Sequence, residues 1–396
     1  MDSPKKITII TANYYPEDTA IGLYTTQFAN YLKSEGYAVQ VITGFPYYPQ
    51  WKIKDTYSNR PSFFSETVDG IEIFRFKQFI PQKVTLISRI LMMLSLFFGT
   101  IINLRKIKKT DLVLCIVPFT ISIIPALFLS KIKKAKVWIH VQDFEFDLAL
   151  ESGIINKNNY ATSLLKKSIF SLETALFSAA DIVSSISYTM VEKIKERSSH
   201  NSPYFFPNWV SAEKINPKTS SQHPLIDADK CTLLYSGNIG EKQDWQLLKK
   251  LCELIKVDNS IEIVIVGDGS YKNTLTEHLA PFTFVKFYKP VPYGELNDLL
   301  CSADAHFLFQ KKAVLDTIMP SKILAMMASG KPSIITGNEI SEVNTIINQS
   351  NCGYYFTENN AELDIYAAVI AIKNKTVDRN FGENKEAILL KNFRKN

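Results

Sequence analysis

Short runs of apolar residues alternate with amphipathic segments along most of the chain. Each apolar run has the length of a strand, and each amphipathic segment repeats its apolar residues at helical spacing. Strands that alternate with helices in this way predict parallel, doubly wound sheets. The predicted strand, helix and strand cover residues 7–10, 23–35 and 39–42 in the first half, and 232–235, 245–254 and 261–266 in the second.

The length of 396 residues indicates two domains, because one hydrophobic core rarely serves so long a chain. The predicted seam is the aromatic stretch 204–209, which the polar stretch 211–230 follows. We therefore expect two Rossmann-like α/β domains, at 1–209 and 210–383. Ligands of doubly wound domains bind beyond the carboxyl ends of the strands. Two such domains facing each other would form a cleft with glycine loops on both walls.

The most apolar segment, 84–104, allows three interpretations. At about 20 residues it is long enough to span a bilayer, but it contains Arg89 and Asn103. A spanning helix would also separate the first strands from the rest of their sheet. A buried core helix is the second interpretation. We favour the third, a helix that lies in the membrane interface and is held there by cations, namely Lys83, Arg89, Arg105, Lys106 and Lys108.

The distribution of charge supports a membrane surface as a partner. The net charge is +6, and many of the cations lie at 105–109 and 131–136, close to the apolar segment. Cations beside apolar sequence indicate an anionic lipid surface before they indicate nucleic acid. The sequence also contains no basic-aromatic motif for nucleic acid, so no nucleic-acid partner is expected.

The cysteines indicate a cytosolic protein. There are five of them, without CxxC spacing and in apolar or mixed surroundings, so we expect reduced thiols in the core. The first ten residues are too short and too strand-like for a secretory signal. The predicted location is therefore cytoplasmic, peripheral on the inner face of the cytoplasmic membrane.

The loop after a predicted strand at 305–309 is a candidate phosphate site. It holds three cations and one carboxylate, and Ser321 can cap the helix that begins there. A helix start with free N–H groups and a lysine beside it suits phosphate, although an ordinary cap with solvated charges would have the same sequence. The candidate residues are Lys311, Asp316, Pro320, Ser321 and Lys322.

Two glycine loops at strand ends add to this site. Gly237, Asn238 and Lys242 lie between a predicted strand and a helix, which suits a diphosphate. Their loop is neither a Walker A motif nor the dinucleotide fingerprint with three spaced glycines. Gly267 and Gly269 follow the next strand and offer backbone against which a nucleotide can lie.

The first half contributes a second group of candidates. Gly22, at the start of a helix, would let a ligand approach the backbone, although turns use glycine constantly. His140 lies near the end of a predicted strand and Asp143 at its exit, and a structural role for His140 is equally compatible with the sequence. With Glu145 and Asp147, Asp143 forms an acidic region that suits sugar hydroxyls or proton acceptance. No nucleophile elbow, zinc site or Cys-His pair is visible, and we expect neither a metal nor a cofactor besides the donor substrate.

Four stretches together resemble the retaining glycosyltransferases of family four, which have the GT-B fold. Within that family the chain is most similar to the colanic-acid-type fucosyltransferases and their relatives in bacterial capsule and O-antigen assembly. The stretches are 15–24 with 45–51, 140–145, 206–209 with 235–243, and 310–312 with 320–322.

The resemblance implies transfer of a sugar from a nucleoside-diphosphate sugar with retention at the anomeric carbon, as in a hexosyltransferase, and without an obligatory metal. Asn238 and Lys242 fall where the family holds the donor diphosphate, and Ser321 and Lys322 would complete that grip. Such groups stabilise the charge that develops on the leaving diphosphate. Gly22 would give the substrate room against the first domain, which would bind a polyprenyl-diphosphate-linked saccharide as acceptor. The resemblance also implies a terminal helix, at 384–396, that crosses back to the first domain.

Two departures from the family pattern leave alternatives open. Many members carry two glutamates eight positions apart in the last motif, where this chain has Thr317 and Ala325, and Asp316 could replace one of them. The family's cleft histidine aligns with Gln142, or with His140 if the strand shifts, so His140 and Asp143 are predicted together without divided roles. An inactive scaffold that binds sugar nucleotides, or a sugar-nucleotide epimerase, stays possible. The donor is equally open between GDP-fucose and a UDP-sugar.

Overall fold

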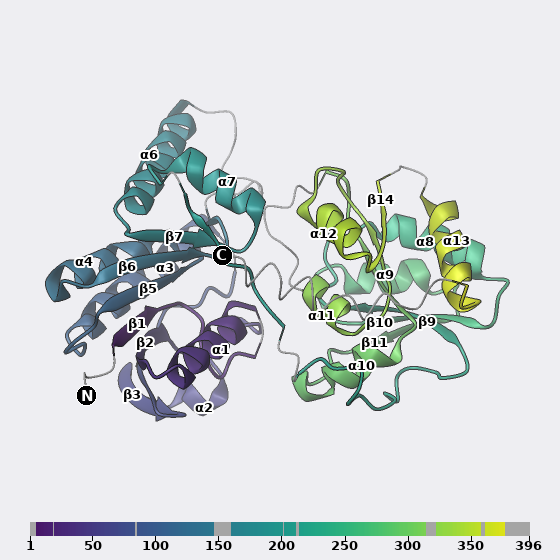
Figure 1. Ribbon diagram of the computed structural model, residues 1–396, viewed down its shortest axis with the longest axis horizontal. Helices are drawn as coiled ribbons and strands as arrows, with labels where there is room; N and C mark the ends of the chain where they lie inside the picture. Colours follow the sequence, from purple (N-terminus) through teal and green to yellow (C-terminus); the bar gives the residue numbers. More distant parts are fainter. Residues whose placement is uncertain are drawn as a thin grey trace. The chain divides into compact units, whose positions relative to one another are not determined.

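The computed structural model divides the chain into two compact units, Met1–Asn208 and Trp209–Asn396 (Figure 1). Each unit is built on one sheet, and the predicted pair of α/β sheets is confirmed. The predicted helix at 384–396 lies outside the described residues. The structure describes residues 5–18, 20–83, 85–145, 160–200, 202–210, 214–313, 322–357 and 361–376.

The first unit contains an eight-stranded sheet. Its strands are β1 Lys6–Ile10, β2 Ala38–Gly44, β3 Phe63–Val68, β4 Ile71–Phe76, β5 Leu112–Val117, β6 Lys136–Val141, β7 Ile182–Ser185 and β8 Tyr204–Phe205. They follow the order β3-β4-β2-β1-β5-β6-β7-β8, and all pairings are parallel except that of β3 with β4. The functional loops of a parallel sheet therefore gather at one edge, beyond the carboxyl ends of the strands.

Helices cover both faces of this sheet. They are α1 Ala20–Ser34, α2 Asp55–Ser58, α3 Leu86–Leu104, the 3₁₀ turn η1 Thr120–Ser122, α4 Ile123–Lys133, α6 Tyr160–Ser178 and α7 Tyr188–Arg197. Because alternate residues of a strand point to opposite faces, Ile7 and Ile9 join one core with α1. Val113 and Cys115 join another core with α3 and α4.

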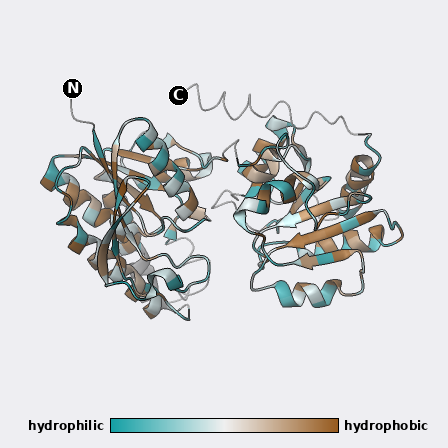
Figure 2. Ribbon diagram, turned by 90° about the horizontal axis from the view of Figure 1, so that it is seen from below, coloured by the Kyte–Doolittle hydropathy of each residue, from teal (hydrophilic) through white to brown (hydrophobic). Residues whose placement is uncertain are grey.

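The second unit contains a six-stranded parallel sheet in the order β11-β10-β9-β12-β13-β14. Its strands are β9 Cys231–Ser236, β10 Ile261–Val266, β11 Val285–Tyr288, β12 Ala305–Phe309, β13 Ser333–Thr336 and β14 Gly353–Phe356. Its helices are α8 Trp245–Ile255, α9 Lys272–Leu279, η2 Tyr293–Glu295, α10 Leu296–Ser302, α11 Lys322–Ala328, α12 Glu342–Ser350 and α13 Glu362–Lys373. The strands are strongly hydrophobic (Figure 2), as expected for a sheet covered on both faces. All five cysteines are buried and free, which confirms the predicted core thiols.

The apolar segment forms α3, which packs on the first sheet by one face and exposes the other. Met92 and Leu96 are buried, and a Cβ at Gly99 would come within 2.1 Å of the Phe76 ring of β4. Among the described helices, Ile87–Leu104 alone is long and apolar enough to cross a membrane, with a mean hydropathy of 1.8 and 33% of the segment buried. The opposite face is apolar and exposed, and consists of Ile87, Ile90, Leu91, Leu94, Phe98 and Ile102.

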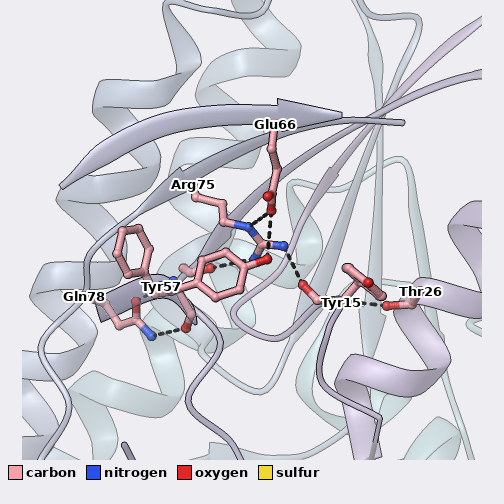
Figure 3. A network of polar contacts seen from close by, with 8 residues as sticks. Tyr15, Thr26, Tyr57, Glu66, Arg75 and Gln78 are labelled. Carbon is pink, nitrogen blue, oxygen red and sulfur yellow. Dashed lines mark hydrogen bonds and ion pairs between the residues drawn. The ribbon is translucent and has the colours of Figure 1, made fainter. Parts of the chain in front are cut away.

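A buried arginine joins the loops at the carboxyl edge of the first sheet (Figure 3). The Arg75 side chain of β4 is completely buried and forms an ion pair with Glu66 of β3. Its guanidinium also lies over the Tyr57 ring, 4.9 Å from the ring centre, and donates to the carbonyls of Gly44 and Tyr15. The five donors of a guanidinium make such branched contacts possible. One side chain thus connects β3, α2, the end of β2 and the loop after β1.

We expect Arg75→Met to lower the stability of the first unit by about 3–5 kcal/mol, because it leaves the Glu66 carboxylate without its buried partner. The double variant Arg75→Met, Glu66→Gln should lose less, because no charge is then left unpaired. Urea unfolding of the full chain measures both. Lys52→Met removes an exposed pair with Asp55 and should change stability by less than about 1 kcal/mol. Equal losses for Arg75→Met and Lys52→Met would contradict the assigned role.

Candidate functional site

The cations predicted for the second unit lie together beyond β9 and β12. The Lys311 N–H donates to the Lys242 carbonyl at 3.0 Å, and Gln243 pairs with Gln310 in an isolated antiparallel bridge. These contacts join the loop 236–243 to the loop after β12. The side chains of Lys242, Lys311 and Lys312 are exposed, so three cations face solvent at the same edge of the sheet.

The glycines of this edge allow two loops to pack closely. Gly237 has φ +143°, in the range that favours glycine. A Cβ at Gly267 would come within 2.0 Å of the Gly237 carbonyl oxygen, and one at Gly269 within 2.3 Å of the Ile239 carbonyl oxygen. The Ile239 N–H also donates to the Asp268 carbonyl at 2.8 Å. Packing between loops is therefore a sufficient reason for Gly267 and Gly269, and their contact with a nucleotide stays a prediction.

Lys322, at the start of α11, reaches the same loop. Its Nζ donates to Tyr235 Oη at 2.9 Å and lies 4.3 Å from the centre of the Tyr235 ring. Tyr235 Oη donates in turn to the carbonyl of Asn238, whose side chain is exposed. A Cβ at Gly237 would lie 2.9 Å from Lys322 Nζ. The ammonium group therefore lies directly beside the glycine and holds the loop through the tyrosine.

Burial lowers the pKa of Lys322 to about 8, because the ammonium has lost much of its hydration. None of the described carboxylates forms an ion pair with it. A partly buried cation whose contacts are a hydroxyl and an aromatic ring is well suited to accept an anion. Three other predicted donor residues, Asp316, Pro320 and Ser321, lie outside the described residues.

In the first unit, Gly22 is packed against a buried carboxylate. A Cβ at Gly22 would come within 2.7 Å of the Glu17 Cβ, so the space in front of this glycine is occupied by Glu17. Glu17 Oε1 accepts the N–H groups of Tyr47 at 2.7 Å and Tyr48 at 2.8 Å, and Oε2 accepts Asn13 Nδ2 at 2.9 Å. Burial raises the pKa of Glu17, while the three hydrogen bonds oppose that rise. The predicted approach of substrate to Gly22 stays a prediction.

His140 is buried within a hydrogen-bonded network at the end of β6. Its Nδ1 lies 2.9 Å from Ser184 Oγ, and its Nε2 accepts from Gln142 Nε2 at 2.9 Å. Gln142 and Asn208 exchange two amide hydrogen bonds, at 2.9 and 3.0 Å. Burial lowers the pKa of His140 to about 3, so the ring is neutral at physiological pH. Both ring nitrogens are engaged, and this geometry favours a positioning role for His140.

The acidic region after β6 contains one carboxyl group of unusual proton affinity. Glu145 accepts the Thr120 N–H at 3.2 Å. Burial raises the pKa of Glu145 to about 8, with a further rise from the charge of Asp143 and an opposing effect of Arg89. A group that exchanges its proton near neutral pH can serve acid-base chemistry. Asp143 itself is partly buried beside it.

Sequence comparisons identify the family. The model of the group 1 glycosyl transferases matches residues 217–387. The putative colanic acid biosynthesis glycosyl transferase WcaI of Escherichia coli (strain K12) is 30% identical over 360 residues, which cover 85% of this chain and 84% of that protein. The chain belongs to the group 1 glycosyltransferases. The probable glycosyltransferase WbjE of Pseudomonas aeruginosa is 23% identical over 210 residues, or 51% of each chain.

Solved structures show that this glycosyltransferase has the GT-B fold. Sucrose-phosphate synthase from Thermosynechococcus elongatus superposes with a TM-score of 0.68 at 13% identity, over 96% of this chain and 92% of that one. Anabaena HepE in complex with UDP and glucose gives a TM-score of 0.64 at 12% identity, over 97% and 94%. The predicted GT-B fold and family resemblance are confirmed.

Three residues important to the geometry of this glycosyltransferase were not predicted. Tyr235 and Glu17 belong to stretches that carry the family resemblance, but their side chains had no assigned role. Arg75 lies in the strand 71–76, which is apolar apart from Glu72 and Arg75 itself. A cation in such a strand could have been recognised from the sequence as a residue with buried polar partners, because a buried charge needs a partner.

The position of Lys322 predicts a pH-dependent affinity for nucleoside diphosphates. A bound diphosphate stabilises the protonated lysine, so affinity should be full below the pKa of about 8 and fall as pH rises above it, by up to about tenfold per pH unit. Titration calorimetry with UDP or GDP between pH 7 and 9.5 measures this dependence. Lys322→Met should bind weakly at pH 7 and show a much flatter profile, whereas the exposed control Lys249→Met should behave like the wild type. An unchanged slope in Lys322→Met would contradict the assignment.

Proposed function

We propose that this protein is a retaining glycosyltransferase that moves a sugar from a nucleoside-diphosphate sugar onto a lipid-diphosphate-linked saccharide. The sugar would be fucose or an N-acetylamino sugar, and the product an intermediate of a bacterial exopolysaccharide, capsule or O-antigen. The observation that carries the proposal is the grouping of Lys242, Lys311 and Lys322 around one loop of the second unit. The colanic acid relative and the UDP and glucose complex of the structural neighbour support this chemistry.

In the proposed reaction, the bond between the anomeric carbon and the diphosphate breaks, and negative charge builds on the leaving group. Preorganised cations and N–H donors stabilise that charge. Lys242 and Lys322 would supply the cations, and the Asn238 amide a neutral donor. Asp316, Pro320 and Ser321 complete the predicted donor site, and no metal or cofactor is required by the proposal.

For the acceptor side, Asp143 is the preferred candidate to contact the reacting hydroxyl. His140 has both ring nitrogens bonded to Ser184 and Gln142, so it would act by holding the end of β6 in place. Gly22 and Glu17 would position the loop after β1 in the same way. A residue can serve as acid or base only if it lies within hydrogen-bond distance of the reacting proton, and its pKa matters after that condition is met.

The exposed face of α3 would bring the first unit to the cytoplasmic face of the membrane. This face carries six large apolar side chains, and Phe128 and Ile132 of the neighbouring α4 are also exposed. Arg105, Lys108 and Lys131 are exposed at the ends of the two helices. An apolar face flanked by cations binds an anionic interface without spanning it. Such a peripheral location would bring the enzyme beside a polyprenyl-linked acceptor.

The donor class is tested by thermal stabilisation of the protein with GDP, UDP, dTDP, ADP and CMP. A nucleotide at 100 times its dissociation constant adds about 2.7 kcal/mol to the free energy of unfolding, which is readily detected as a rise in melting temperature. We expect such a rise with either GDP or UDP and not with the other nucleotides. With the responding donor, Lys242→Ala should lower kcat by about 10²–10³-fold, the effect of losing one transition-state stabilising group. Lys249→Ala, on the exposed face of α8, serves as the control.

The alternatives give different results in the same assays. Selective nucleotide binding without any measurable sugar transfer, in the wild type as in Lys242→Ala, would favour the inactive scaffold. Conversion of the sugar nucleotide without an acceptor would favour an epimerase. An absence of any nucleotide response would contradict the transferase proposal.

Membrane association is tested by flotation with phosphatidylglycerol vesicles. Ile87 is 73% exposed on the outer face of α3, and Ile87→Asp places a charge there. The variant should bind vesicles with about tenfold or more lower affinity, because burial of apolar side chains in the interface drives such binding. Ile340→Asp, at an 80% exposed isoleucine of the second unit, is the matched control and should bind like the wild type. Equal binding by all three proteins would refute a docking role for α3.

A further inference from the structure

Two loops at the carboxyl edge of the first sheet, which Glu17 joins, carry the aromatic residues Tyr15, Tyr48 and Trp51, and we term these residues the aromatic shelf. Tyr15 is 41% and Trp51 44% exposed, whereas Tyr47 at the base of the shelf is buried. The Trp51 ring meets the ring of Tyr47 at 5.7 Å and that of Tyr48 at 6.4 Å, both edge-on. The shelf thus presents large rings to solvent on a packed aromatic base.

The backbone of the shelf is fixed by buried side chains. Glu17 accepts the N–H groups of both Tyr47 and Tyr48. The Tyr15 carbonyl accepts from Arg75, and its N–H donates to Thr26 Oγ1 at 2.9 Å (Figure 3). Exposed rings held by buried charges lose little conformational entropy when a ligand binds, which is the general condition for a preorganised site.

The backbone conformation of Trp51 is strained, and packing of its side chain does not explain the strain. Its φ is +54°, in the left-handed region that bulky residues rarely occupy. A glycine or asparagine would adopt this conformation with less strain. The indole is only about half buried, so burial gives little in return for the strain. Strain at an exposed aromatic residue points to a ligand.

The charges around the shelf limit the kind of ligand. Lys52 pairs with Asp55 at 3.3 Å, and Lys54 Nζ donates to the Pro16 carbonyl at 2.7 Å. Lys54 also lies within the electrostatic reach of the Glu17 carboxylate. The two described cations of this loop therefore each have a carboxylate nearby, and the shelf lacks the cluster of unpaired cations that a phosphate or an anionic lipid surface would need. Tyrosine and tryptophan offer an apolar ring face with a polar edge, which matches a pyranose with its C–H face and its ring of hydroxyls.

We propose that the aromatic shelf binds a sugar ring of the saccharide acceptor, with the C–H face of the pyranose stacked on Trp51 and its hydroxyls directed toward the neighbouring Tyr48. This inference rests on the proposed transferase function and names the acceptor-recognition element of the first unit. Trp51 would be a specificity determinant and would leave donor binding unaffected.

The test uses the full-length protein and a panel of methyl glycosides of fucose, glucose, galactose and N-acetylglucosamine, followed by saturation-transfer NMR. We expect binding of at least one glycoside, with affinity about tenfold lower in Trp51→Ala, by analogy with the cost of losing one aromatic stacking partner. Trp51→Phe, which keeps a ring, should retain most of the affinity. Tyr37→Ala, which removes another exposed aromatic residue of the first unit, should bind like the wild type.

Several outcomes would overturn the proposal. Wild-type affinity in Trp51→Ala, no glycoside binding by the wild type, or equal losses in Trp51→Ala and Trp51→Phe would each do so. Loss of vesicle binding without loss of glycoside binding in Trp51→Ala would assign the shelf to lipid and would also overturn it. Glycine readily adopts the backbone conformation of Trp51, so Trp51→Gly should fold without strain at this position. An unchanged melting temperature together with lost glycoside binding in this variant would support a binding role for the Trp51 ring. Thermal stabilisation by GDP or UDP is measured in parallel. Its absence would contradict the proposed transferase function, whereas its presence without glycoside binding would contradict the shelf alone.

Discussion

A backbone N–H or C=O group beyond the end of a parallel strand has lost its neighbouring strand, and when buried it must find another partner. In this glycosyltransferase, side chains take that place. Glu17 accepts two backbone N–H groups of the loop after β2, and Arg75 donates to two carbonyls. In the second unit Tyr235 donates to the Asn238 carbonyl and is itself held by Lys322. The described parts of the candidate loops are therefore held in place by internal polar contacts.

The sheets could be predicted because their pattern is local. The run 261–266 is apolar except for Glu262 and forms β10, which is buried on both faces. The gathering of Lys242 and Lys311 was predictable too, since the carboxyl ends of parallel strands share one edge. The backbone partners of Glu17, Tyr47 and Tyr48, were not, because they lie 30 and 31 residues further along the chain and depend on how two loops fold together. Gly267 likewise signals a close approach in the sequence, but only the structure shows that a protein loop makes it.

The choice of lysine at position 322 has a chemical meaning. An arginine would stay charged under all ordinary conditions, whereas a buried lysine can release its proton when no anion is present. Lys322 rests on a tyrosine hydroxyl and an aromatic face, which are neutral partners. With a pKa of about 8, the Lys322 ammonium is largely charged at neutral pH but can release its proton in mildly alkaline solution, and a bound diphosphate would hold that proton in place.

Strand β4 contacts two different surfaces of the first unit through consecutive residues. Phe76 lies against Gly99 of α3 on one face of the sheet, while Arg75 extends from the other face to Glu66 and the Tyr15 carbonyl. A displacement of α3 would move Phe76 and, through the strand, the guanidinium that holds Tyr15. Because Gly99 leaves no space between helix and strand, β4 mechanically connects α3, for which we propose membrane contact, to the loop that carries Tyr15.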